Sequence, residues 1–135
     1  LSPGTTLLWD LGYKKIWKES PFVNAAVLIT RLISKPNTNI YCFDLGHKAV
    51  ASEMPLPRVE ILGLESAIHK SQSEEHLIVE YIEDNDFKVG DLFYALPYHI
   101  CPTVAKYNRV YTIEDGVHTG YWNVEARDHQ IELDT

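Results

Sequence analysis

Residues 109–122 read RVYTIEDGVHTGYW, and this stretch decides the fold class of the chain. Asp115-Gly116 separates two segments that are rich in β-branched and aromatic residues, which favour extended backbone. An Asp-Gly pair supplies the positive φ angles of a type I′ turn, whose twist matches that of two antiparallel strands. Residues 109–114 and 117–122 are therefore predicted to form a β-hairpin.

The same pattern of short strands and turns extends along the rest of the chain. Residues 27–33 (VLITRLI) predict a strand, with a short buried helix as the competing interpretation. The turn at residues 36–39 leads to a second strand at residues 40–44, so these two are expected to form a hairpin. Further short strands are predicted at Thr5–Trp9, Val59–Gly63, Ala67–Lys70, His76–Tyr81 and Leu92–Leu96. Turns at intervals of about 8–12 residues predict an all-β, mainly antiparallel barrel or sandwich with little helix.

The composition excludes several classes of protein. With 135 residues and 45% hydrophobic residues, the chain is predicted to be one globular domain, residues 1–135. The net charge of −7 and the lack of a basic stripe argue against binding of nucleic acid. No apolar run approaches the roughly 18 residues of a membrane span. The two cysteines, Cys42 and Cys101, predict no disulfide framework and suit the cytoplasm. The start, Leu1–Gly4, has no initiator Met and no signal peptide pattern, so we expect it to be a cut at a domain boundary.

His99-Ile100-Cys101, between Pro97 and Pro102, is the candidate metal site. The prolines are predicted to deny helix to this segment, so the imidazole and the thiol are expected to project from the same face of an extended backbone. Nitrogen and sulfur donors together suit zinc, and two protein ligands leave positions open for water or substrate. The alternative is a packed cysteine beside a histidine that is bonded to a backbone carbonyl.

Two other stretches are dense in groups capable of chemistry. Asp44–Ala49 (DLGHKA) fits a strand end in which Gly46 has a positive φ angle and Asp44 bonds to the backbone of the turn. Ser73–His76 (SEEH) is either a general acid/base cluster or a polar turn. Taken alone, each stretch is explained by its turn.

Six short pieces, in this order, resemble one family: Pro3–Thr5; Asp44–Ala49 with Ser52; Ser73–His76; Val89–Asp91; Pro97–Val104; and Asp115-Gly116 before Trp122. The chain is similar to the C-terminal domain of the metal-activated pyridoxal-phosphate enzymes that include D-serine dehydratase and D-threonine aldolase. The resemblance implies a β-barrel like the C-terminal domain of alanine racemase. It also implies a function, namely the metal-binding domain of a lyase that acts on β-hydroxy D-amino acids.

The resemblance implies roles for particular residues. His99 and Cys101 are expected to hold a divalent metal, with zinc as the expected ion, and Cys101 favours the dehydratase branch over the aldolase branch. Asp44, Lys48 and His76 match family motifs and are candidate catalytic residues without assigned roles. Asp44 and His76 are expected to line an interface near the metal ligands. His47 departs from the family pattern, in which a small residue is frequent at this position.

The cofactor is expected to lie outside these residues. In the family, pyridoxal phosphate is bound to a lysine of an N-terminal (β/α)₈ barrel, which this sequence lacks. We therefore expect the chain to be excised from a two-domain enzyme and to be inactive alone. The implied partners are a small D-amino acid, the barrel domain and a second copy in a homodimer. Two alternatives remain: a domain of a metal-free amino-acid racemase, and a non-catalytic β-barrel binding module.

Overall fold

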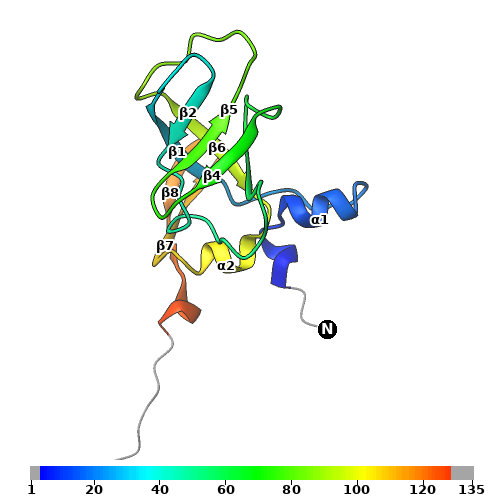
Figure 1. Ribbon diagram of the computed structural model, residues 1–135. Helices are drawn as coiled ribbons and strands as arrows, with labels where there is room; N and C mark the ends of the chain where they lie inside the picture. Colours follow the sequence, from blue (N-terminus) through cyan, green and yellow to red (C-terminus); the bar gives the residue numbers. More distant parts are fainter. Residues whose placement is uncertain (1–3, 129–135) are drawn as a thin grey trace, which may run out of the picture.

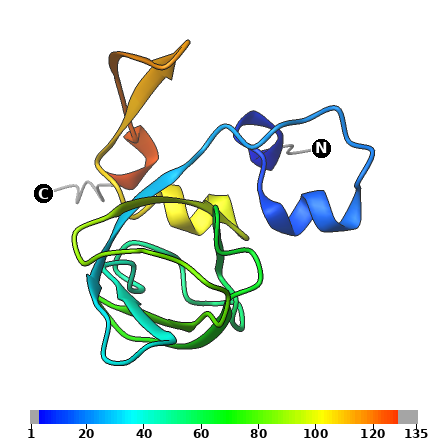
Figure 2. The ribbon, with the colours of Figure 1, turned by 90° about the horizontal axis from the view of Figure 1, so that it is seen from above.

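A six-stranded antiparallel sheet forms the body of the molecule in the computed structural model, which describes residues 4–128 (Figure 1). The strand order is β3-β6-β1-β2-β5-β4. The strands are β1 (Leu28–Ser34), β2 (Ile40–Phe43), β3 (Val59–Ile61), β4 (Ile68–Gln72), β5 (Leu77–Glu80) and β6 (Leu92–Pro97). The sheet curls round on itself into a partly closed barrel, which is seen from above in Figure 2. The predicted all-β, mainly antiparallel fold with little helix is confirmed.

The predicted hairpin of β1 and β2 is confirmed, and the helical alternative for residues 27–33 is excluded. The two strands pair antiparallel through Leu32 with Phe43 and Ser34 with Cys42, and the register shifts between the two pairs. Such a shift bends a strand and strengthens its twist, which helps a sheet to curl.

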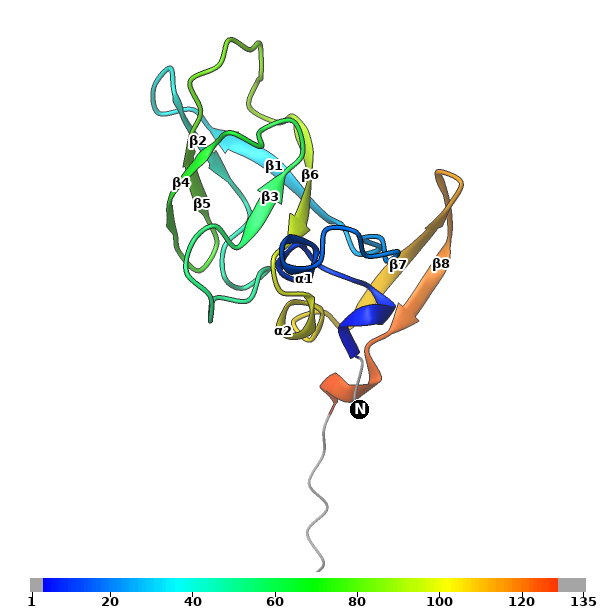
Figure 3. The same ribbon diagram turned by 90° about the vertical axis from the view of Figure 1, so that its right-hand side faces the viewer.

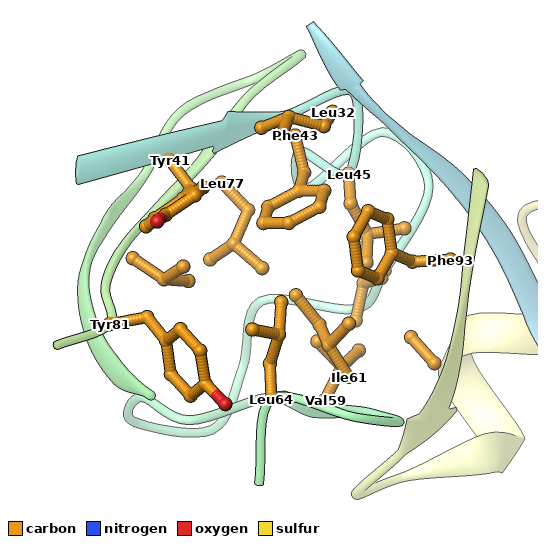
Figure 4. Close-up of a cluster of buried hydrophobic side chains, with 13 residues drawn as sticks. Leu32, Tyr41, Phe43, Leu45, Val59, Ile61, Leu64, Leu77, Tyr81 and Phe93 are labelled. Atoms are coloured by element: carbon orange, nitrogen blue, oxygen red, sulfur yellow. The ribbon is translucent and has the colours of Figure 1, made fainter. Parts of the chain in front are cut away.

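The hydrophobic core lies inside the curl of the sheet (Figure 4). Alternate residues of the strands of this sheet other than β4 are buried, as in β2, where Tyr41 and Phe43 are buried while Ile40 and Cys42 are only half-buried. The Phe43 and Phe93 rings meet edge to face at 5.2 Å between centroids. Each fully buried side chain of this size contributes about 1.5–3 kcal/mol relative to exposure. The core therefore fixes which face of each strand is turned to solvent.

Short helical segments gather at one end of the sheet (Figures 1 and 3). They are the 3₁₀ helix η1 (Gly4–Leu7) and the α-helices α1 (Leu11–Ile16) and α2 (Ile100–Val104). The strand predicted at residues 5–9 is wrong. The Leu8 and Trp9 N–H groups both donate to the Thr5 carbonyl, at 3.3 and 2.7 Å, so this segment turns instead of extending. Asp10 then accepts a hydrogen bond from the Tyr13 N–H and caps α1.

The predicted hairpin at residues 109–122 is confirmed as β7 (Arg109–Glu114) and β8 (Val117–Asn123). Asp115 and Gly116 have φ angles of 49° and 77°, as a type I′ turn requires. The hairpin is a separate two-stranded sheet that projects from the body (Figure 3). The 3₁₀ helix η2 (Glu125–Arg127) follows it.

Pro3, the first residue of the Pro3–Thr5 piece, lies outside the described residues. Within residues 4–128, none of the helices has the length and apolar character needed to cross a membrane.

Candidate functional site

The extended backbone predicted for the segment between Pro97 and Pro102 is wrong from Ile100 onward, whereas His99 is extended with φ −140° and ψ 102°. Strand β6 ends at Pro97, His99 is the N-cap of α2, and Cys101 lies in the first turn of that helix. Pro102 is tolerated there because backbone N–H groups in the first turn of a helix have no intrahelical partner. The two candidate ligands are therefore placed by a strand-to-helix junction rather than by the alternation of a strand.

His99 and Cys101 nevertheless both reach the surface, on either side of a buried residue. The His99 side chain is 41% exposed and Cys101 is exposed, while Ile100 between them is only 4% exposed. His99 Nδ1 lies 2.6 Å from Glu53 Oε1, and Cys101 Sγ lies 3.2 Å from Thr5 Oγ1. Burial of Ile100 anchors the segment and leaves the nitrogen and sulfur donors at the surface.

The buried carboxylate of Asp10 holds the start of α2 against the N-terminal segment. Its Oδ1 accepts a hydrogen bond from the Tyr13 N–H at 2.9 Å, and its Oδ2 accepts one from the Ile100 N–H at 3.1 Å. The Gly12 N–H donates to the Tyr98 carbonyl at 3.1 Å, and a Cβ on Gly12 would lie only 2.6 Å from that oxygen. Glycine at position 12 therefore permits the close approach of the two segments.

Thr103 joins α2 to the long loop that follows β2. Its hydroxyl donates to the His99 carbonyl at 2.7 Å and accepts from the Ala51 N–H at 3.2 Å. Tyr107, just beyond α2, donates its hydroxyl to the Ala49 carbonyl at 3.0 Å. The loop therefore runs along α2 and brings Glu53 to the His99 ring.

Sequence reasoning missed Asp10 and Glu53. They are separated from their partners Ile100 and His99 by 90 and 46 residues, so no local spacing could reveal the contacts. An aspartate directly before a short segment with helical propensity is an N-cap signal, and Asp10 could have been recognised by it.

The motifs at residues 44–49 and 73–76 dock against each other. Gly46, His47 and Lys48 donate their backbone N–H groups to the carbonyls of Glu75, Ser73 and Glu74, at 3.0, 2.9 and 3.0 Å respectively. A Cβ on Gly46 would lie 2.2 Å from the Glu74 carbonyl oxygen and 2.4 Å from the Glu75 carbonyl carbon. The glycine is therefore required by backbone contact.

The side chain of Lys48 forms ion pairs with two carboxylates beside this contact. Lys48 Nζ lies 2.5 Å from Glu75 Oε1 and 3.3 Å from Glu74 Oε2. The hydrogen bond to Glu75 and then that to Glu74 raise the pKa of Lys48, and the bond from Lys48 lowers the pKa of Glu75. The side chains are 60–69% exposed, so solvent screens these pairs strongly.

The structure places the three candidate catalytic residues in two different settings. Lys48 lies beside the turn that contains His76, whose backbone carbonyl and N–H bond to Ser73. The Asp44 carboxylate instead accepts hydrogen bonds from the Thr30 hydroxyl and the Arg31 N–H, both at 2.7 Å. The local prediction that Asp44 bonds the backbone of its own turn is wrong, because the carboxylate is bonded to the neighbouring strand β1. Gly46 is also not among the glycines with a positive φ angle.

His99 and Cys101 offer a nitrogen and a sulfur, which are donor types that zinc accepts. Within residues 4–128, no group of three or more His, Cys, Asp and Glu side chains is arranged to hold a metal ion. Hollows lie at the base of the β7–β8 hairpin and beside Asp84–Asp86, and none of the predicted site residues lines them. A metal bound by His99 and Cys101 would therefore need further ligands from water, a substrate or other parts of a protein.

Comparison with known structures shows the fold. The chain is similar to D-threonine aldolase from Filomicrobium marinum (TM-score 0.71, 19% identity, 80% of this chain and 29% of that chain). It is also similar to an alanine-racemase-like protein from Idiomarina loihiensis (TM-score 0.62, 20% identity, 74% and 31%). D-threo-3-hydroxyaspartate dehydratase from Delftia sp. HT23 gives a TM-score of 0.61 at 16% identity (75% and 32%). The chain thus spans about a third of the length of each of these proteins.

Two further structures are variants of D-threo-3-hydroxyaspartate dehydratase. One variant carries alanine in place of a histidine, and the other carries alanine in place of a cysteine two positions later in the sequence. The cysteine variant is described as the metal-free form. No curated protein matches the sequence. Residues 25–113 match the family described as "Putative serine dehydratase domain". Because this match covers more than half of its residues, the chain belongs to the serine dehydratase domain family.

Proposed function

We propose that this chain is the metal-binding domain of a pyridoxal-phosphate-dependent lyase acting on β-hydroxy D-amino acids, with His99 and Cys101 as its metal ligands. One observation carries the proposal. An imidazole and a thiol stand at the surface on either side of the buried Ile100, at a junction held by Asp10 and Thr103.

The chemistry of the two donors supports zinc as the metal. Zinc accepts both imidazole nitrogen and thiolate sulfur, and a site with few protein ligands keeps positions for water or substrate. Among the described residues, His99 Nδ1 is occupied by Glu53, and Nε2 has no hydrogen-bond partner. The free nitrogen and the sulfur of Cys101 are the atoms that we assign to the metal.

The relatives support the substrate class. By their names, two of the similar structures act on D-threonine and on D-threo-3-hydroxyaspartate, which both carry a hydroxyl on the β-carbon. The histidine and the cysteine that were replaced in the dehydratase have the same spacing as His99 and Cys101. Cysteine at the second position favours dehydration over aldol cleavage for this protein.

Metal and cofactor have separate tasks in such a reaction: pyridoxal phosphate delocalises the negative charge that develops on the α-carbon, and the metal polarises the β-hydroxyl as a Lewis acid. This chain would hold the metal and keep its open positions facing the substrate. The cofactor would lie in a barrel domain outside these residues, for which the greater length of the similar structures leaves room. A homodimer in the cytoplasm is part of the same proposal.

Asp44, Lys48 and His76 remain candidate catalytic residues in this proposal. Lys48 is the strongest of them, because its ammonium group is exposed and can exchange its carboxylate partners for a substrate. Asp44 is the weakest, because its carboxylate is already bonded to β1.

The proposal is tested on the protein as it is expressed from its gene, supplied with pyridoxal phosphate and zinc. We expect D-serine or D-threo-3-hydroxyaspartate to yield a 2-oxo acid and ammonia, and a chelator to abolish this activity until zinc is restored. His99→Ala and Cys101→Ala should each lower the rate by at least tenfold. His118→Ala, on the hairpin, and Cys42→Ala, on β2, are the matched controls and should retain full activity.

Two outcomes would contradict the proposal. One is racemisation of an amino acid that is insensitive to chelators, which would favour the metal-free racemase. The other is a protein that neither binds zinc nor converts any of these amino acids, which would favour a non-catalytic binding module.

A further inference from the structure

We propose that Glu53 is a positioning residue that orients the His99 ring and directs its free Nε2 outward. This inference deepens the proposed function and rests on it for the consequence for metal binding. Its basis is the contact of 2.6 Å between Glu53 Oε1 and His99 Nδ1. Because the carboxylate only accepts hydrogen bonds, the hydrogen of the neutral ring lies on Nδ1 and the lone pair lies on Nε2.

The contact depends on the packing around it and is not a chance encounter of two surface side chains. Ala51, two residues before Glu53, is 5% exposed, and its N–H donates to the hydroxyl of Thr103. That same hydroxyl donates to the His99 carbonyl, and Thr103 is 1% exposed. One buried threonine therefore fixes the backbone of both partners, so that the two side chains meet.

The expected consequence concerns ligand quality more than fold stability. The two side chains are 41% and 42% exposed, and pairs with this exposure add little to stability. A carboxylate on the second ring nitrogen fixes the tautomer and the orientation of a metal-binding histidine and raises its basicity. Loss of such a partner typically weakens metal affinity by about 10–100-fold.

The first test measures zinc affinity by competition with a chelating dye. We expect Glu53→Ala to weaken binding by about 10–100-fold. Glu53→Gln should lose less, because its amide oxygen still accepts from Nδ1 but carries no charge. The matched control is Glu80→Gln on β5, which removes a carboxylate that pairs with Lys70 at 3.0 Å. The control should bind zinc like the wild type, and all three variants should keep the wild-type melting temperature.

The second test needs no metal. Nitrogen-15 NMR of the neutral ring, recorded at about pH 8, reports which nitrogen carries the hydrogen. We expect the Nδ1–H tautomer in the wild type and in Glu53→Gln, and a mixture or the Nε2–H tautomer in Glu53→Ala. An Nε2–H tautomer in the wild type would overturn the inference about Glu53.

The two tests separate failure of the inference from failure of the proposed function. If zinc depends on His99 and Cys101 but binds equally well to Glu53→Ala, then Glu53 has no positioning role. If the NMR result is as expected but no zinc binds to the wild type, then the ring is oriented by Glu53 and the proposed metal function is wrong.

Discussion

Two clusters of polar side chains on this molecule differ in whether their polar atoms are paired within the chain. At the docked loops, Gly46–Lys48 and Ser73–His76, backbone groups pair across the contact, and the charge of Lys48 is balanced by two carboxylates. At the start of α2, the side chains of His99 and Cys101 contact one polar side chain each, Glu53 and Thr5 respectively, and are partly exposed. The first cluster mainly satisfies itself, whereas the second offers a nitrogen and a sulfur to something outside the chain. Density of polar residues is therefore a poorer guide to a binding site than unused donor atoms.

The largest expected effect on stability comes from adding a side chain at Gly46, where the two loops are in contact. In Gly46→Ala the new Cβ meets the backbone at 2.2 Å, so one loop must move and the three backbone hydrogen bonds must distort. We expect a loss of at least ~3 kcal/mol in the free energy of unfolding, measured by urea denaturation. Gly4→Ala, whose Cβ would meet nothing within 4 Å, should change stability little. Equal stability of the two variants would show that the docking is not tight.

The next effect concerns the support of the α2 site. Asp10→Ala removes the cap of α1 and leaves the buried Ile100 N–H without its acceptor, so we expect a loss of about 2 kcal/mol. Asp10→Asn keeps an oxygen for the cap and should lose less. Urea denaturation measures both losses, and zinc affinity should fall in parallel. Unchanged zinc affinity in a destabilised Asp10→Ala would mean that Asp10 does not order the site.

A smaller effect concerns the half-buried His69. His69 in β4 has a buried Nδ1 without a partner among the described residues, and burial lowers its pKa. The unfolded state therefore takes up the proton at a higher pH, so stability falls as the pH drops below the ordinary histidine pKa. Between about pH 7.5 and about pH 5.5, His69→Gln should lose less stability than the wild type. An identical loss in both proteins would contradict this assignment.

The smallest effect on stability is expected at the exposed charges of the docked loops. Lys48→Met and Glu75→Gln remove solvent-screened pairs and should leave the unfolding midpoint within experimental error. The lowered pKa of Glu75 implies that what little the pair contributes is present at neutral pH and is lost as the pH falls through that lowered pKa. If Lys48 is catalytic, Lys48→Met lowers the turnover rate while stability is kept. A full turnover rate would remove Lys48 from the catalytic candidates.

Most of the sheet could be predicted from local sequence. Alternating apolar residues identified β5, and the Asp115-Gly116 turn identified the β7–β8 hairpin, because both signals arise between near neighbours. Local rules failed where a helix replaced extended backbone. The flanking prolines predict no helix at residues 97–102, but Pro102 lies in the first turn of α2, where a proline removes no hydrogen bond.

The candidate site was only partly predictable. The spacing of His99 and Cys101 predicts them as metal ligands, and this stays a prediction, while the backbone that places them is not the one expected. Contacts with Glu53 and Thr5 connect residues that are 46 and 96 positions apart, so they depend on how the loop and the N-terminal segment fold back onto α2. That arrangement results from tertiary packing, which no local pattern specifies.

X-ray absorption at the zinc edge, on the zinc-loaded protein as it is expressed from its gene, tests the assignment of the metal ligands most directly. We expect one sulfur at about 2.3 Å together with nitrogen and oxygen neighbours. The sulfur signal should disappear in Cys101→Ser and the imidazole signal should fall in His99→Ala. A spectrum without sulfur, or one that both substitutions leave unchanged, would contradict the assignment of these two residues.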